Sequence, residues 1–341
     1  MRFEVEIKHF EEKILELKKR FFIPGISVAI SLENGIIFAK GFGYADIGNK
    51  IEATPTTPYR IASLTKPIAS TIILQLVEKG ILELDKSIAE YIPGYLEICE
   101  KNRKLLEERN LVHLIKNYHF KNQNITIRHH LQQTIVREPG EEYEYNGLLF
   151  GFLGIAVDFQ IAEKFLGLVR KNIIDTLDMV DSLPCQEDVS KPEVLKRLAK
   201  PYRINKEFNY ELSEYPQKNG SAAAGIVSTV IDYMKFDKAI NTNTLIQEKT
   251  KEMAFTNPKT KTGKELPYGL GWFIQEVKEH KVVWHYGLWD NSFSSLYLKI
   301  PSMKLSLVMF ANSDGLSKLF NLHEGNILTS PFAKSFLDIF L

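Results

Sequence analysis

The sequence predicts a mixed α/β (α+β) fold, in which one antiparallel sheet is flanked by terminal helices and joined to a mostly helical lobe. Three observations support this prediction. Short β-rich runs separated by turn residues occur near both ends of the chain, in residues 23–48 and 268–312. The pattern between them is mostly helical, from about residue 67 to about residue 251. Segments with helical patterns open and close the chain.

The first 60 residues contain a predicted helix and a predicted hairpin. Apolar residues recur at helical spacing with charges between them, which is typical of a surface helix. These residues are Phe3, Ile7, Phe10, Ile14 and Leu17. Two β-rich runs then flank Glu33-Asn34-Gly35, and Asn-Gly is a strong hairpin signal.

The middle of the chain contains several predicted helices. An apolar helix over residues 68–80 ends at Gly80, and an amphipathic helical stretch covers residues 97–120. A second apolar helical region spans residues 147–174. A further helix follows at residues 228–240, with Ser228 or Thr229 as its cap.

The length of the chain indicates more than one packing unit. At 341 residues, either two domains or one domain with a large insertion is expected. We assign residues 1–60 and 265–341 to a discontinuous sheet domain, and residues 61–264 to a mostly helical domain. The last helix is expected at about residues 330–341. A cleft between the two lobes is the expected place for a site.

Composition excludes several classes of protein. With 44% apolar and 25% charged residues, the chain is typical of a globular protein, and its net charge of +1 predicts no nucleic-acid partner. No run approaches the roughly 18 apolar residues of a transmembrane helix, and Cys99 and Cys185 do not make a disulfide framework. The N-terminus lacks the apolar core of a secretory leader. The sequence as given therefore predicts a cytoplasmic location, with a periplasmic or extracellular one as the alternative if a leader was removed.

Ser63 and Lys66 form the only Ser-x-x-Lys pair in the chain. Pro67 is tolerated only in a first helical turn, so the helix begins near residues 64–66 and Ser63 stands at its N-terminal end. Both side chains then share one face. Free amides at the helix end favour an anion, and desolvation in a cleft would make the lysine neutral enough to act as a base. Alone, such a short motif is weak evidence.

Several further segments accompany this pair, and together they resemble one family. "RIASLTK" is similar to the active-site segment of the serine hydrolases related to class C β-lactamases, D-Ala-D-Ala carboxypeptidases and many esterases, and the resemblance covers most of the chain. It implies a β-lactamase/transpeptidase-like fold. The other matching segments are "ITIRHHL" at 125–131, "PGEEYEYNG" at 139–147, "NIIDTLDMVDS" at 172–182, "AAAGIVSTVIDYMKF" at 222–236 and "YGLGWFI" at 268–274.

The resemblance implies roles for residues far from Ser63. Tyr145 matches the catalytic tyrosine, which is expected to shuttle the proton between Ser63 and the leaving group with Lys66 as its electrostatic partner. A phenol titrates near pH 10, so it needs a nearby cation to become a useful phenolate.

The third motif of the family has two matches in this chain. We choose His285-Tyr286-Gly287, in a β-rich run after "YGLGW", over Lys261-Thr262-Gly263, which lies in a polar, turn-rich run before it. His285 is then the substrate-binding residue, and Gly287 is expected to let the substrate backbone approach closely. The Leu288 amide is expected to join that of Ser63 in an oxyanion hole, where one donor is worth about 3 kcal/mol.

Three departures from the family pattern narrow the expected chemistry. Gly147 replaces the asparagine of Tyr-x-Asn, and Asn146 is the remaining candidate for its substrate-binding role. "HLQQTIV" replaces "LLSHTSG", and His285 replaces a lysine that would hold a substrate carboxylate. These changes argue against an efficient β-lactamase and leave carboxypeptidase, aminopeptidase or esterase chemistry open. The alternative from another class is a non-catalytic binder or penicillin-binding sensor with this fold.

No metal or cofactor is expected. The clustered histidines lack a metal-binding spacing and are predicted to be solvated helix-face residues. They are His113, His119, His129 and His130. Three tryptophans, Trp272, Trp284 and Trp289, lie near the predicted cleft, with sheet packing as their default role. A small molecule or short peptide is the expected substrate. The sequence leaves open its identity and the oligomeric state.

Overall fold

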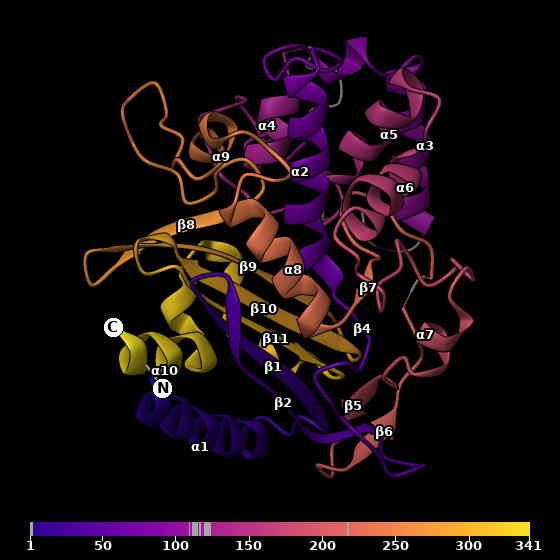
Figure 1. The fold of residues 1–341 in the computed structure, drawn as a ribbon. Helices are drawn as coiled ribbons and strands as arrows, with labels where there is room; N and C mark the ends of the chain where they lie inside the picture. Colours follow the sequence, from indigo (N-terminus) through magenta and orange to yellow (C-terminus); the bar gives the residue numbers. More distant parts are fainter. Residues whose placement is uncertain (1–2, 109, 111–114, 116, 119–123, 217) are drawn as a thin grey trace.

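A seven-stranded sheet occupies the lower half of the molecule in Figure 1. In this computed structural model the described residues are 3–108, 110, 115, 117–118, 124–216 and 218–341. The strand order is β3-β2-β1-β11-β10-β9-β8, and each neighbouring pair is antiparallel. The strands are β1 (Gly25–Leu32), β2 (Gly35–Asp46), β3 (Ile51–Glu52), β8 (Phe273–Val277), β9 (His280–Trp289), β10 (Phe293–Ile300) and β11 (Leu305–Ala311). Because β1 pairs with β11, the predicted antiparallel sheet built from both ends of the chain is confirmed.

The two terminal helices pack together on one face of this sheet (Figure 1). They are α1 (Glu4–Arg20) and α10 (Pro331–Phe340). The first contributes Phe10, Ile14 and Leu17 to an apolar cluster shared with α10 and the sheet. The predicted flanking helices are therefore confirmed, and they bury the stripe that the helical spacing indicated.

The central strands are buried on both faces. Along β11, Leu307 and Met309 point to the cluster under the terminal helices, whereas Val308 and Phe310 join the other cluster. This alternation follows from the two-residue period of a strand. The second face is covered by α8 (Val230–Asn241).

Helices make up most of the upper half of the molecule in Figure 1. The helix α2 is buried along most of its length. The helices of this region are α2 (Thr65–Glu78), α3 (Tyr95–Glu108), α4 (Ile127–Gln132), α5 (Gly151–Gln160), α6 (Phe165–Leu168) and α9 (Glu248–Ala254), with a π-helix at Val169–Asp175. A further short helix and two strand pairs lie beside the sheet. They are α7 (Pro192–Lys196), β4 (Tyr59–Arg60) with β7 (Val227–Ser228), and β5 (Tyr202–Ile204) with β6 (Tyr210–Leu212).

Three local predictions are refined by the structure. The helix expected over 97–120 is described to Glu108, and most of the remainder lies outside the described residues. Thr229 is the cap of α8, because its Oγ1 accepts the Asp232 N–H at 3.1 Å. The hairpin turn falls one residue earlier than Asn-Gly, since Glu33 and Asn34 have φ of 51° and 69°.

The sheet and the helices share an apolar core. One cluster runs from Phe310 of the sheet through α8 and α2 to α5. α8 belongs to the stretch 61–264 and packs directly on a face of the sheet. The division into two domains at residues 60 and 265 stays a prediction.

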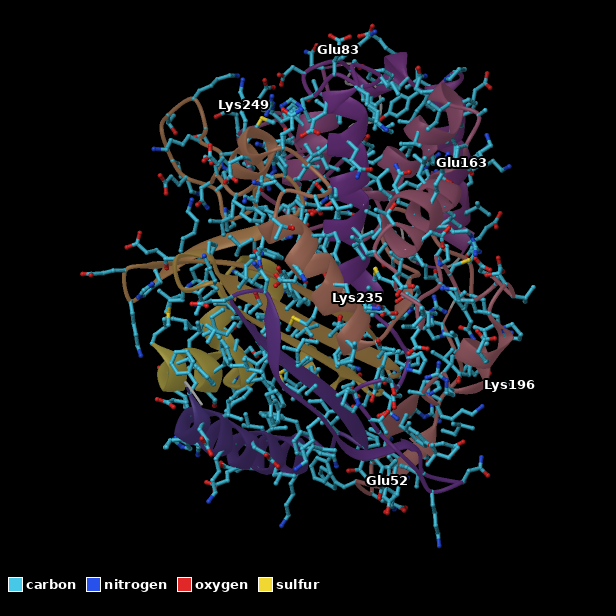
Figure 2. The ribbon with its side chains drawn as sticks, in the orientation of Figure 1. Glu52, Glu83, Glu163, Lys196, Lys235 and Lys249 are labelled. Carbon is cyan, nitrogen blue, oxygen red and sulfur yellow. The ribbon has the colours of Figure 1, made fainter. Side chains whose placement is uncertain are left out.

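Charged side chains cover the outside of the molecule. Glu83 and Glu52 project from opposite ends of it in Figure 2, and both are exposed. Within the parts of the chain that the structure describes, no helix is both long enough and apolar enough to span a bilayer.

Candidate active site

Ser63 lies in a tight turn that leads directly into α2. A 3₁₀ turn at Ala62–Leu64 joins the helix at Thr65, within the start that Pro67 predicts. Ala62 has φ of 49°, a left-handed conformation that costs energy for a residue with a Cβ. The turn is held against the sheet, where Ser295 Oγ donates to the Ile61 carbonyl at 2.7 Å. The serine is therefore presented by a strained but anchored turn.

Lys66 points back toward Ser63 from the first turn of the helix. Its Nζ donates to Ser63 Oγ at 3.0 Å and to the Ala223 carbonyl at 3.0 Å. The side chain is fully buried, and this burial lowers the pKa of Lys66 to about 7. Both acceptors are uncharged, so these contacts supply no negative charge to oppose the effect of burial.

Tyr145 lies beside the same pair. The Lys66 ammonium nitrogen is 5.3 Å from the centre of the Tyr145 ring. Burial raises the pKa of Tyr145, and the neighbouring Ser63 hydroxyl opposes part of that rise. The phenol oxygen nevertheless makes no hydrogen bond of ordinary geometry to the described residues. The Ser63 and Tyr145 hydroxyls are therefore close to each other without the geometry of a hydrogen bond. The structure thus brings together the three predicted catalytic residues.

His285 is placed differently from the prediction. It lies on β9, but it is fully buried and does not line the cleft. Its Nε2 is 2.8 Å from the Tyr268 hydroxyl and its Nδ1 is 2.6 Å from the Tyr286 carbonyl. Since a carbonyl only accepts, Nδ1 carries the proton and Nε2 accepts from Tyr268. Burial, with the nearby Lys66, holds the pKa of His285 well below its usual range.

His285 consequently packs beside Tyr145 in the protein interior. Its ring centre is 6.0 Å from that of Tyr145, and both nitrogens are already bonded. In this structure the side chain is fully buried and does not line the cleft, so the substrate-binding role of His285 stays a prediction.

Gly287 is required, but for another reason than the one predicted. A Cβ at this position would lie 2.2 Å from Ser295 Oγ and 2.4 Å from the Ile61 carbonyl. The close approach that the structure shows is that of the Ser63 turn, which packs against β9, and the approach of a substrate backbone stays a prediction.

The segment around Tyr145 is held by a residue that the sequence did not single out. Gln133 is fully buried, and its Oε1 accepts the Asn146 N–H at 2.6 Å. Its carbonyl accepts the Glu144 N–H at 3.1 Å. Gln133 lies in "HLQQTIV", the segment that departs from the family pattern. This departure is the sequence feature that could have pointed to Gln133.

Asn146 is partly committed to the backbone. Its Oδ1 accepts the N–H groups of Leu148 and Leu149 at 2.9 and 3.0 Å, as in an Asx turn. This oxygen is therefore occupied, although the residue lines the cleft. No atom lies within 4 Å of a Cβ built on Gly147, so the missing side chain leaves open space there.

A cleft of about 500 Å³ opens in front of Ser63. Leu288 lines it, as expected for an oxyanion-hole residue, and the hole itself stays a prediction. Trp289 also lines it, with the Arg60 guanidinium 4.7 Å from its ring centre. Beyond Ser63 and these two, the lining residues are Glu144, Tyr145, Asn146, Gly147, Leu148, Asn219, Gly220, Ser221, Ala223 and Ala224.

Several other sequence features lie away from this cleft. Lys261, whose side chain is 76% exposed, belongs to a surface loop that pairs with Glu138 and Glu141. Trp272 and Trp284 are buried in the core, as their default role implied.

The histidine cluster has no metal-binding geometry in the described residues. His113 and His119 lie outside those residues, while His130 is fully buried, so its expected solvated position is wrong. Over the described residues, no three side chains from His, Cys, Asp and Glu gather closely enough to bind a metal ion.

The fold, with a serine, a lysine and a tyrosine gathered at one cleft, is of the β-lactamase-like type. Residues 10–328 match the sequence profile of the family described as Beta-lactamase, and the chain belongs to that family.

Two curated relatives show the range of similarity. Protein flp of Staphylococcus aureus (strain MW2) is 26% identical over 326 residues, which cover 85% of this chain and 60% of the relative. Penicillin-binding protein 4* of Bacillus subtilis (strain 168) is 23% identical, over 90% of this chain and 72% of the relative. The chain therefore spans about 60% of the length of the first of these proteins.

Solved structures share the fold. The octameric penicillin-binding protein homologue from Pyrococcus abyssi matches with a TM-score of 0.76 and 21% identity, over 97% of this chain and 77% of that one. The D-amino acid amidase from Ochrobactrum anthropi SV3 matches with a TM-score of 0.73 and 17% identity, over 98% of both chains. At such identities the likeness establishes the β-lactamase-like fold alone.

Proposed function

We propose that this protein is a serine hydrolase that cleaves amides or esters through an acyl-enzyme. The observation that carries the proposal is the contact of 3.0 Å between Ser63 Oγ and a fully buried Lys66 amine whose pKa is lowered to about 7. A nucleophile needs an adjacent base that is neutral at working pH, and this lysine meets that need. Amidase and esterase chemistry are favoured over efficient β-lactam hydrolysis, since no cation in the described lining would hold a substrate carboxylate.

The proton moves in a closed cycle. Neutral Lys66 takes the Ser63 proton as Oγ bonds to the substrate carbonyl carbon, and the amides of Ser63 and Leu288 stabilise the oxyanion. The bond to the leaving amine or alcohol then breaks. Tyr145 donates its hydroxyl proton to the leaving group and regains one from Lys66. Water next attacks the acyl carbon, loses a proton to Lys66, and the proton returns to Ser63 Oγ as the acid leaves.

This scheme gives Lys66 the role of base and Tyr145 that of acid. Burial raises the pKa of Tyr145, so its phenolate is disfavoured before reaction. Once Lys66 has taken the Ser63 proton, its positive charge lies 5.3 Å from the Tyr145 ring centre. This charge makes it easier for the phenol to give its proton to the leaving group.

The decisive experiment measures turnover of a p-nitrophenyl ester and labelling by a fluorescent penicillin. We expect ester turnover that is lost in Ser63→Ala and reduced about 10²-fold or more in Tyr145→Phe, with thermal unfolding unchanged in the latter. Turnover that survives Ser63→Ala would overturn the serine mechanism. Stable labelling by the penicillin without turnover of the ester would instead favour a penicillin-binding sensor. The absence of both labelling and turnover would favour a non-catalytic binder.

A further inference from the structure

One carboxylate lies among the described residues that line the cleft. Apart from the tyrosine already assigned to catalysis, Glu144 is the only ionisable residue among the described residues that line the space in front of Ser63. No lysine, arginine or histidine belongs to that described lining. His285, which replaces the lysine of the family pattern, is buried behind the site.

Glu144 is fixed in place by two neighbours. Asn117 Nδ2 donates to Glu144 Oε2 at 2.7 Å, and the Glu144 backbone N–H donates to the Gln133 carbonyl at 3.1 Å. Among the described residues its Oε1 has no hydrogen-bond partner, and the side chain is half-buried. One oxygen is therefore held by the protein while the other remains available to a donor in the cleft.

Such a carboxylate selects by charge. A substrate carboxylate beside Glu144 would meet a like charge, with no cation among the described residues that line the cleft, and like charges in a partly desolvated cleft repel strongly. A substrate ammonium would gain a charge-assisted hydrogen bond at Oε1. The free α-ammonium of an amino acid lies next to the carbonyl carbon that Ser63 would attack, because only one carbon separates the two.

We propose that Glu144 is a specificity-determining residue that binds the free α-ammonium of an amino-acid amide, ester or N-terminal residue. The inference rests on the proposed hydrolase function and assigns its substrate class as aminopeptidase-like or amidase-like, not carboxypeptidase-like.

The test compares two anilides that differ in one charge. Alanine p-nitroanilide, tested as both enantiomers, carries the ammonium, and propionyl p-nitroanilide lacks it. Because the ammonium also activates the carbonyl, the diagnostic quantity is the change in the ratio of their kcat/KM values between variants. A charge-assisted hydrogen bond is worth about 1.5–3 kcal/mol, so we expect Glu144→Gln to lower this ratio by roughly 10- to 100-fold, with partial recovery in Glu144→Asp.

The matched control is Glu142→Gln, which removes a charge from the same loop. Glu142 is exposed, pairs with Arg137 and does not line the cleft, so its ratio should equal that of the wild type. Since misfolding lowers both rates together, the ratio is insensitive to it. A ratio unchanged in Glu144→Gln, or equally lowered in Glu142→Gln, overturns the role of Glu144 while Ser63-dependent turnover continues. Absence of any Ser63-dependent turnover of these anilides and of esters overturns the proposed function itself.

Discussion

Two buried lysines occupy different environments in this molecule. Lys66, at the start of α2, is 0% exposed, and Lys299, near the end of β10, is 2% exposed. Lys299 Nζ donates to Asp237 Oδ1 at 2.9 Å and also to Asn241. The hydrogen bonds that Lys66 Nζ makes to described residues go to the Ser63 hydroxyl and the Ala223 carbonyl, and neither of these groups is charged.

The partner decides what each buried amine can do. For Lys299, burial lowers the pKa while the adjacent Asp237 carboxylate opposes that change. The Tyr297 hydroxyl also donates to Asp237 at 2.6 Å, which completes an ionic network between α8 and the sheet. For Lys66 no carboxylate offsets burial, and its pKa falls to about 7. Burial thus produces a structural cation in one place and a base in the other.

Of the two lysines, Lys66 should have the larger effect on activity when its amine is removed. We expect Lys66→Met to lower kcat for a neutral ester by about 10²- to 10⁴-fold, the usual contribution of a general base. The unfolding temperature should be unchanged or higher, because an uncompensated buried amine is costly to fold. Steady-state kinetics and thermal unfolding of one preparation measure both. Activity within fivefold of the wild type would remove Lys66 from the mechanism.

Removing the amine of Lys299 should have the opposite pattern. Lys299→Met leaves Asp237 buried without its cation, so we expect the free energy of unfolding to fall by about 3–5 kcal/mol. The kcat of the folded protein should remain that of the wild type, and chemical denaturation with parallel kinetics tests this.

The double variant Asp237→Asn/Lys299→Met serves as the control. It removes both charges, so it should recover part of the lost stability. A folded Lys299→Met protein with impaired kcat would show that the network also supports the site, and the comparison between the two lysines would fail.

The sequence predicted those parts of the site that depend on local structure. Ser63 and Lys66 are three residues apart at a helix start marked by Pro67, so helical geometry alone brings their side chains together. The strands were predictable in the same way, because their turn residues and β-rich composition are local. Tyr145 lies 82 positions after Ser63 in the sequence, and only the family resemblance connected the two residues.

The remaining features depend on how distant segments pack. The orientation of His285 follows from the register of β9 against β10, and one residue of register exchanges the two faces of a strand. The need for Gly287 arises from the Ile61 carbonyl, which reaches it through the tertiary fold. Glu144 is one of several acidic residues in its loop, and no local pattern marks it as the one that lines the cleft.

The smallest expected effect is a pH dependence that separates the two lysines. With a pKa of about 7, Lys66 is increasingly neutral as pH rises, so kcat/KM for a neutral ester should rise about tenfold from pH 5.5 to 6.5 and level off above about pH 8.

Stability should follow the same group in a predictable direction. Between pH 7 and about 10 the unfolded chain keeps the Lys66 proton that the folded protein has released, so this group makes the free energy of unfolding rise with pH. In Lys66→Met, the contribution of this group to the pH dependence of unfolding should vanish. In Lys299→Met, the rise of kcat/KM with pH should remain, with its midpoint near 7. A midpoint near 10 would mean that Lys66 stays charged, and the two buried lysines would then differ in position but not in chemistry. A profile that is flat from pH 5.5 to 9 would mean that titration of Lys66 does not control turnover, which would remove its role as the base.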